Sequence, residues 1–224
     1  MALKQVRTIF VSDLHLGHKN CKAKEFLAFL TRYEAPLIYL IGDIIDEWRL
    51  KLTWHWPQSH NDIIEEILRR ARLGTTIIYI LGNHDRFGYT QDIPLGNNIF
   101  IKKVTEHKSV DGKRYLILHG DGFDAVTHRT AWLLGTFHWL KFPDWGCIRH
   151  MRRQIARFVN WISSYEKALV AEAKGFDGVI CGHSHKPEIK QIGESKYLNT
   201  GDWVDSKTAI IEELDGTLCL ISEE

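Results

Sequence analysis

The chain has 224 residues, 44% of them hydrophobic, which suits one sizeable domain spanning residues 1–224. Lysine and arginine number 29 against 28 aspartate and glutamate, so the charge balance argues against a nucleic-acid polymer as partner. No apolar run approaches the roughly 18 residues of a membrane span, and the first residues lack the apolar stretch of a signal peptide. Four cysteines without CxxC spacing are typical of reduced thiols, and we expect a cytoplasmic protein.

The first half of the chain alternates buried strands with helices. The segments TIFVSD (8–13), PLIYLIGD (36–43) and TTIIYILGNHD (75–85) each predict a buried strand that ends in Asp or Asn. Helical patterns near 22–33 and 60–73 separate these strands. This βαβαβ order predicts an α/β fold.

The second half of the chain is richer in β-hairpins. Segment 98–121 carries an Asp-Gly pair at 111–112, a strong hairpin turn between two alternating stretches. Segment 208–221 repeats this pattern with an Asp-Gly pair at 215–216. We expect a βα half and a hairpin half, with a helical insertion at about 124–174 between consecutive strands.

Similar polar residues follow strand after strand. The candidates are Asp13 and His15, Asp43, Asn83 and His84, His119, and His183 with His185. In an open α/β sheet, the carboxyl ends of the strands are where ligand sites form. One Asp after a strand is usually a helix N-cap, and a lone His is usually packed or solvated. Five such strand ends, each with a flanking Gly, favour a site instead.

Seven of these side chains have the chemistry of metal ligands. Imidazoles, carboxylates and an amide without any thiolate suit Mn²⁺, Fe, Zn²⁺ or Mg²⁺, and Mn²⁺ is our first choice. Seven ligands are too many for one tetrahedral zinc, but they suit two ions that share a bridging carboxylate. Two ions about 3.5–4 Å apart clamp a phosphoryl group and acidify a water for in-line attack.

The blocks Asp13-x-His15, Gly42-Asp43, Gly82-Asn83-His84, His119 and Gly182-His183-x-His185 resemble the calcineurin-like metallophosphoesterase family, in order and over almost the whole chain. The resemblance implies a four-layer α/β/β/α sandwich of two mixed sheets. It also implies a ligand set: Asp13, His15 and His185 on one ion, Asn83, His119 and His183 on the other, and Asp43 as the bridge.

The resemblance assigns a different role to His84, which would not be a ligand. It would face the substrate phosphate and stabilise the developing charge or protonate the leaving oxygen. Asp85 and Asp121 would orient histidines.

The segments GDIIDEW, WPQSHND and GDWVDS resemble one branch of this family, the UDP-2,3-diacylglucosamine diphosphatases, which release UMP and a lipid monophosphate during lipid A synthesis. The chain departs from that branch at Gly82-Asn83-His84-Asp85, where those enzymes resemble GNRD, and its insertion is shorter. We expect hydrolysis of a UDP-sugar lipid. A nucleotide phosphodiesterase or dinucleoside polyphosphate hydrolase is the alternative. A non-catalytic scaffold is the third, although a scaffold has no need of seven ligands.

The insertion is expected to select the substrate. On a helix, Arg149, Arg153 and Arg157 form one basic stripe. They would meet phosphates, while the aromatic side chains of the insertion would meet acyl chains or the inner membrane as a peripheral contact. The equal alternative is that the arginines form a solvated charged face and that the aromatic side chains fill the core.

Other residues near the blocks carry weaker expectations. We expect Arg86 either to reach a diphosphate or to be solvated, and Asp46 and Trp48 either to shape the cleft or to end a loop. A dense aromatic and histidine cluster is expected either to hold a base or sugar or to pack beneath the site. It consists of Trp54, His55, Trp56 and His60.

Overall fold

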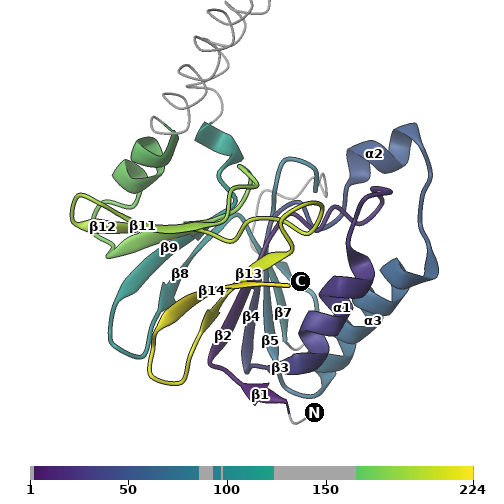
Figure 1. Ribbon diagram of the computed structural model, residues 1–224, viewed down its shortest axis with the longest axis horizontal. Helices are drawn as coiled ribbons and strands as arrows, with labels where there is room; N and C mark the ends of the chain where they lie inside the picture. The colour runs from purple at the N-terminus through teal and green to yellow at the C-terminus, as the bar shows by residue number, and fades with distance from the viewer. Residues whose placement is uncertain (1–2, 86–92, 97, 124–164, 224) are drawn as a thin grey trace, which may run out of the picture.

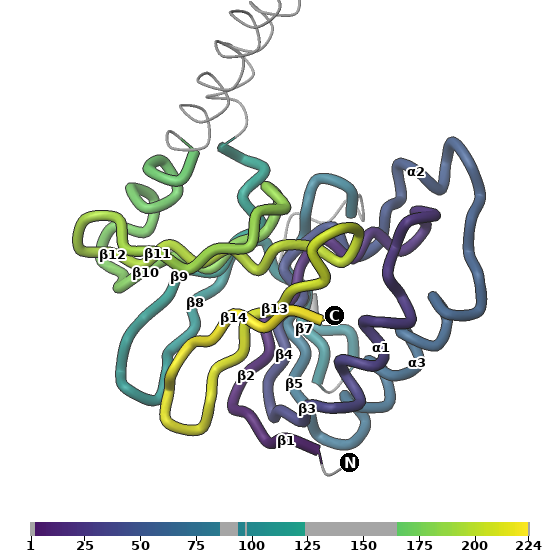
Figure 2. Tube along the Cα trace, in the orientation of Figure 1, coloured from purple at the N-terminus to yellow at the C-terminus, as the bar shows by residue number. Residues whose placement is uncertain are grey.

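The computed structural model describes residues 3–85, 93–96, 98–123 and 165–223. Two β-sheets pack face to face and helices lie on their outer surfaces, which gives four layers (Figure 1). The Cα trace follows the same arrangement (Figure 2). The predicted α/β/β/α sandwich of two mixed sheets is therefore confirmed. Within the described ranges, no helix is long and apolar enough to cross a bilayer.

The first sheet has seven strands in the order β14-β13-β2-β4-β5-β7-β6. Strands β2, β4, β5 and β7 are parallel, whereas β13, β14 and β6 run antiparallel to their neighbours. The bounds are β2 Thr8–Val11, β4 Leu37–Ile41, β5 Thr76–Ile80, β6 Ile93–Pro94, β7 Ile99–Lys102, β13 Thr208–Glu212 and β14 Leu218–Ser222.

The second sheet has five strands in the order β11-β12-β10-β9-β8. Strands β12, β10 and β9 are parallel, and β11 and β8 pair antiparallel at the edges. The bounds are β8 Val104–Lys108, β9 Arg114–Leu118, β10 Gly178–Cys181, β11 Glu188–Ile192 and β12 Ser195–Asn199. A small parallel pair, β1 (Lys4–Gln5) with β3 (Tyr33–Glu34), lies apart from both sheets.

Strands β2 and β4 are buried on both faces. Phe10 and Tyr39 pack between the sheets against Ile180 of β10. Their neighbours Ile9 and Ile38 belong to the core on the opposite, helix-covered face. Because successive side chains of a strand alternate between faces, a strand with both faces covered shows a continuous apolar run.

Helices α1 (Ala23–Arg32) and α3 (Gln58–Arg72) cover the first sheet, close to their predicted positions. Each is amphipathic, and α1 buries Phe26 in the core. Helix α2 (Glu47–Leu52) is short and buries no side chain. Residues 165–172 are helical and pack on the second sheet.

The structure differs in two places from the predicted division into a βα half and a hairpin half. Segment 98–121 forms the predicted hairpin, β8 and β9, but its first residues form β7 of the other sheet. The hairpin of β13 and β14 also joins the first sheet, beside β2, rather than the hairpin half. Alternation is the same in both sheets, so it cannot reveal which sheet a strand joins. Of the predicted insertion, 124–164 lies outside the described residues.

Candidate metal centre

The candidate ligands lie where the parallel strands of both sheets end. Asp13 follows β2, Asp43 follows β4 and the loop with Asn83 follows β5. From the second sheet, His119 directly follows β9 and His183 follows β10. Since the two sheets present the same edge here, residues such as Asp13 and His183, 170 positions apart in sequence, meet at one rim.

Asp13, His15 and His185 form one group whose ligand atoms lie within 4.8 Å of one another. Nε2 of His185 is 3.2 Å from Oδ1 of Asp13, and Nε2 of His15 is 3.8 Å from the same oxygen. The two Nε2 atoms are 3.4 Å apart. Three donor atoms converge on one point, as the coordination of a single ion requires.

Asp43, His119 and His183 form a second group within the same limit. Nε2 of His119 lies 3.3 Å from Oδ2 of Asp43. The same oxygen is 3.9 Å from Nε2 of His15, so Asp43 faces both groups. Asn83 is exposed in the loop after β5. Its role as a ligand and the bridging role of Asp43 stay predictions.

Two buried atoms test whether cations fit this site. Oδ1 of Asp13 and Nε2 of His119 are buried and make no hydrogen bond within the described residues. Nδ1 of His119 donates to the carbonyl of Ile41 at 2.9 Å, which turns Nε2 toward Asp43. Buried polar atoms are normally satisfied, so these two are explained by an absent partner of positive charge. The residues therefore fit two divalent ions.

The local electrostatics agree with this reading. Burial opposes ionisation of Asp13, but the imidazoles of His185 and His119 outweigh it and hold the pKa of this carboxyl below its usual value. Burial also opposes protonation of His119, but the neighbouring Asp43 and Asp13 raise its pKa to about 10. The same carboxylates would attract a divalent ion to this position.

Five candidate ligands have left-handed backbone. The φ angles are 53° at Asp13, 50° at His15, 53° at Asp43, 65° at His183 and 54° at His185. Non-glycine residues rarely adopt this region, and a residue held there costs about 1–3 kcal/mol. Such strain persists where the surroundings fix it, commonly at functional sites, and here it aims side chains across the rim.

Glycines let the loops approach closely. A Cβ on Gly42, whose φ is 76°, would lie 2.2 Å from Nδ1 of His119. A Cβ on Gly82 would lie 2.3 Å from Oδ1 of Asp43. The flanking glycines of the sequence blocks therefore make room for the ligands themselves.

The sequence left open whether Asp46 shapes the cleft or ends a loop. In the structure, Asp46 orients two histidines. Its Oδ2 lies 3.2 Å from Nδ1 of His15 and its Oδ1 lies 2.9 Å from Nδ1 of His84. Oδ1 also accepts the amide of Arg49 as the N-cap of α2. Because Nδ1 of His15 donates to Asp46, Nε2 is free to face the first ligand group. An Asp before a helix is expected as an N-cap in any case. The sequence therefore could not show that Asp46 also orients His15 and His84.

His84 lies beside the ligand groups with a quarter of its side chain exposed. The hydrogen bond with Asp46, opposed by burial, raises the pKa of His84. Its Nε2 is 4.0 Å from Oδ2 of Asp43, and its amide donates to Oδ1 of the same residue at 2.8 Å. Trp48 packs edge-on against its ring.

Asp85 orients backbone amides rather than the histidines for which it was predicted. Its carboxylate accepts from the amides of Asp43 and Ile45, at 2.6 and 2.9 Å, and from the hydroxyl of Tyr79. It therefore fixes the strained loop after β4. The correction has a simple cause: adjacency to His84 in sequence says nothing about where the carboxylate points.

Two further residues were missed by sequence reasoning. Nδ2 of Asn199 donates to the carbonyl of Gly182 at 2.7 Å and to the hydroxyl of Ser184 at 3.0 Å. Asp202 is buried, with Oδ2 3.9 Å from Nδ1 of His185. Asn199 holds the turn that carries His183 and His185, and Asp202 faces the imidazole of His185. Asp202 lies in the GDWVDS segment, which was its only signal in the sequence, whereas Asn199 lies just before that segment.

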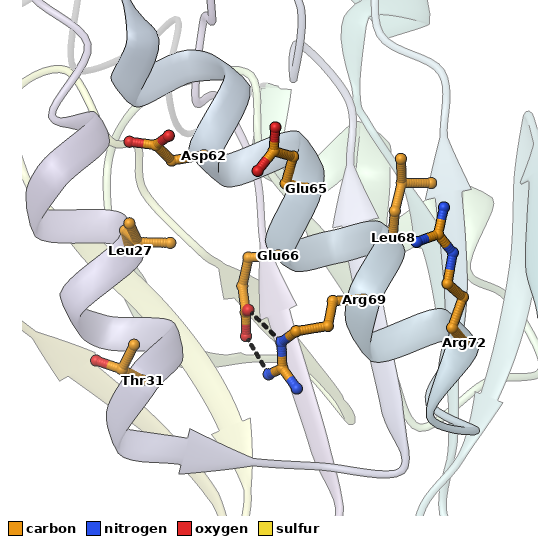
Figure 3. A pocket seen from close by; sticks show the side chains of 8 residues that line it. All are labelled: Leu27, Thr31, Asp62, Glu65, Glu66, Leu68, Arg69 and Arg72. Carbon is orange, nitrogen blue, oxygen red and sulfur yellow. Dashed lines mark hydrogen bonds and ion pairs between the residues drawn. The ribbon is translucent and has the colours of Figure 1, made fainter.

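Not every hollow belongs to this site. A cavity of about 550 Å³ lies between α1 and α3, lined by Asp62, Glu65, Glu66, Arg69 and Arg72 among others (Figure 3). Its central Glu66 is already paired with Arg69 and Arg70, both at 2.7 Å. No candidate metal ligand lines it.

The predicted substrate contacts Arg86, Arg149, Arg153 and Arg157 lie outside the described residues.

Comparison with known proteins gives the family. The model of the calcineurin-like phosphoesterases matches residues 6–187. The UDP-2,3-diacylglucosamine hydrolase of Wigglesworthia glossinidia brevipalpis is 25% identical, over 96% of this chain and 93% of its own. That of Photorhabdus laumondii is 28% identical, over 83% and 84%. A solved hypothetical protein of Pyrococcus horikoshii OT3, 12% identical, shares the fold with a TM-score of 0.55 over 98% of this chain and 88% of that one. The chain belongs to the calcineurin-like phosphoesterase family.

Proposed function

We propose that this phosphoesterase is a dinuclear metal-dependent hydrolase of a phosphoric anhydride. The proposed substrate is UDP-2,3-diacylglucosamine or a similar UDP-sugar lipid, and the products are UMP and a lipid monophosphate. The observation that carries the proposal is the pair of ligand groups that meet at Asp43, with His84 beside them. The names of the relatives, which align over most of their length, support the substrate.

The ligand groups would divide between two ions, with Mn²⁺ as the proposed metal. When bound, the ions would neutralise phosphate charge and acidify a water for attack on phosphorus. Asp13, His15 and His185 would hold one ion, and Asn83, His119 and His183 the other. Asp43 would contact both.

His84 supplies the proton chemistry in this proposal. Its Nδ1 donates to Asp46, and this hydrogen bond raises the pKa of the ring. A second proton, on Nε2, would lie beside Asp43 and therefore beside the reacting phosphate. From there it can stabilise the developing charge or pass to the leaving oxygen.

Turnover by the purified protein with Mn²⁺ tests the proposal. We expect hydrolysis of bis(p-nitrophenyl) phosphate, and of UDP-2,3-diacylglucosamine to UMP with a higher kcat/KM than of dinucleoside polyphosphates. The reverse preference would favour the nucleotide hydrolase. Absence of turnover on all three substrates, with two ions bound per chain, would show a scaffold.

A further inference from the structure

A groove beside the metal centre is open and cationic. It has a volume of about 480 Å³, within the roughly 300–1,000 Å³ of small-molecule sites. Its walls are the loop after β2 and the segment from α2 onward: Gly17, His18, Lys19, Arg49, Thr53, Trp54 and His55. We call it the α2 groove.

The α2 groove is built by the same two loops that carry His15 and Asp46. The amide of His18 donates to the carbonyl of His15 at 2.8 Å, and the amide of Arg49 donates to Oδ1 of Asp46 at 2.9 Å. One end of the groove is therefore three residues along each loop from the metal centre. A molecule with a phosphate at the centre can extend into it.

One wall of the groove is suited to an anion. Nδ1 of His18 accepts the amide of Asn20 at 3.1 Å, so the ring carries its proton on Nε2. That Nε2 lies 3.4 Å from Nη2 of Arg49, which is also a donor. Two donors that face each other need a shared acceptor. In the part of the chain that the structure describes, no carboxylate forms an ion pair with Arg49 or Lys19.

The other wall is aromatic. The ring of Trp54 is 78% exposed, and His55 is exposed beside it. Among the described residues, the side chains that line the groove include no Leu, Ile or Val, and a flat heterocycle can stack on Trp54. Trp56 and His60, from the same sequence cluster, serve packing instead: Trp56 donates to Asn61, and His60 is buried.

We propose that the α2 groove binds the nucleotide half of the substrate. A phosphate lies against His18, Lys19 and Arg49, and the base stacks on Trp54 beside His55. This inference rests on the proposed function and deepens it, because it places the nucleotide end of the anhydride over α2. It also divides the cluster of tryptophans and histidines whose role the sequence left open. In this proposal Trp54 and His55 contact the ligand, whereas Trp56 and His60 pack in the protein.

Calorimetric binding of UMP to the metal-free protein tests the groove without turnover. Trp54→Ala should weaken UMP binding about tenfold through loss of stacking, and leave ribose 5-phosphate binding unchanged. Arg49→Ala should weaken both ligands about tenfold. Lys51→Ala and Leu52→Ala, on α2 but outside the groove lining, are matched controls and should change neither.

The outcomes separate the two proposals. UMP affinity that is the same in Trp54→Ala, Arg49→Ala and the wild type would overturn the groove, even if the enzyme is active. Binding to phosphatidylglycerol vesicles that depends on Trp54, without UMP binding, would also overturn it. Wild-type UMP binding that both variants lose, in a protein without turnover, would retain the groove and refute only the hydrolase.

Discussion

Strand β2 has a buried charged cluster at each end, and the two clusters differ in whether their carboxylate oxygens are all hydrogen-bonded. At its start, Thr8 and Ser109 donate to Glu212 at 2.7 Å, and His107 lies 3.1 Å from the same carboxylate. Both oxygens of Glu212 are satisfied, and the bonds join the two sheets. Beyond its other end lies Asp13, whose buried Oδ1 makes no hydrogen bond within the described residues.

The backbone shows the same contrast. Thr8 and Glu212 pair in regular strand register. Asp13 and Asp43, in contrast, have φ angles of 53° in the left-handed region. The cluster at Glu212, which is fully hydrogen-bonded and lies on regular strands, stabilises the sandwich. The cluster at Asp13, which has an unsatisfied oxygen and lies on strained loops, is suited to binding ions and substrate. Completeness of hydrogen bonding, rather than burial of charge, separates structure from function here.

The largest effect is expected at the end with the unsatisfied oxygen. Asp43→Asn should reduce turnover by on the order of 10³-fold or more and lower metal content at both positions, because it removes the charge that faces both groups. Metal analysis and kcat with the chromogenic diester measure this. Asp215→Asn, in an exposed turn, is the control. Full occupancy of both positions in Asp43→Asn would refute the bridging role.

His84→Gln should lower kcat by about 10²- to 10⁴-fold while both ions stay bound. If His84 is a general acid, wild-type kcat falls as pH rises through its raised pKa, and the variant lacks that decline. A pH profile with metal analysis checks both points. Loss of metal from the variant would mean that His84 is itself a ligand.

At the fully hydrogen-bonded end, Glu212→Gln should lower the free energy of unfolding by about 2 kcal/mol, because an amide cannot accept all the donors. Opposed by burial, the hydrogen bonds lower the pKa of Glu212 to about 2 from 4.5. Its stabilisation is therefore present above pH 4.5 and lost as the pH falls toward 2. Urea unfolding of wild type, Glu212→Gln and the partly exposed control Glu213→Gln measures this. Equal stability of the three would remove the structural role.

The smallest effect is expected at Asp46, which orients His15 and His84 without facing the reacting phosphate. Asp46→Asn should cost about 10- to 100-fold in metal affinity or turnover, because one of the two histidines loses its acceptor. Titration with Mn²⁺ and steady-state kinetics measure the change, with Asp62→Asn on α3 as control. An effect as large as that of Asp43→Asn would make Asp46 a ligand.

The sequence was sufficient wherever local pattern decides structure. Continuous apolar runs placed β2, β4 and β5, and Asp-Gly pairs placed the turns at 111–112 and 215–216. Polar residues after successive strands located the rim, because parallel strands end at one edge. Which oxygen or nitrogen faces which neighbour depends on side-chain direction, and the roles of Asp46, Asp85 and Asn199 followed only from that.

By itself, the sequence located the buried strands through their periodicity and the residues that gather at the rim through their place after successive strands. The resemblance of its blocks to a known family implied the two-sheet sandwich. Tertiary structure alone decided that β7 and the last hairpin join the first sheet. It alone separated exposed Trp54 from packed Trp56, and incomplete Asp13 from satisfied Glu212. These distinctions depend on partners distant in sequence, which only the packed sheets bring within a hydrogen bond's reach.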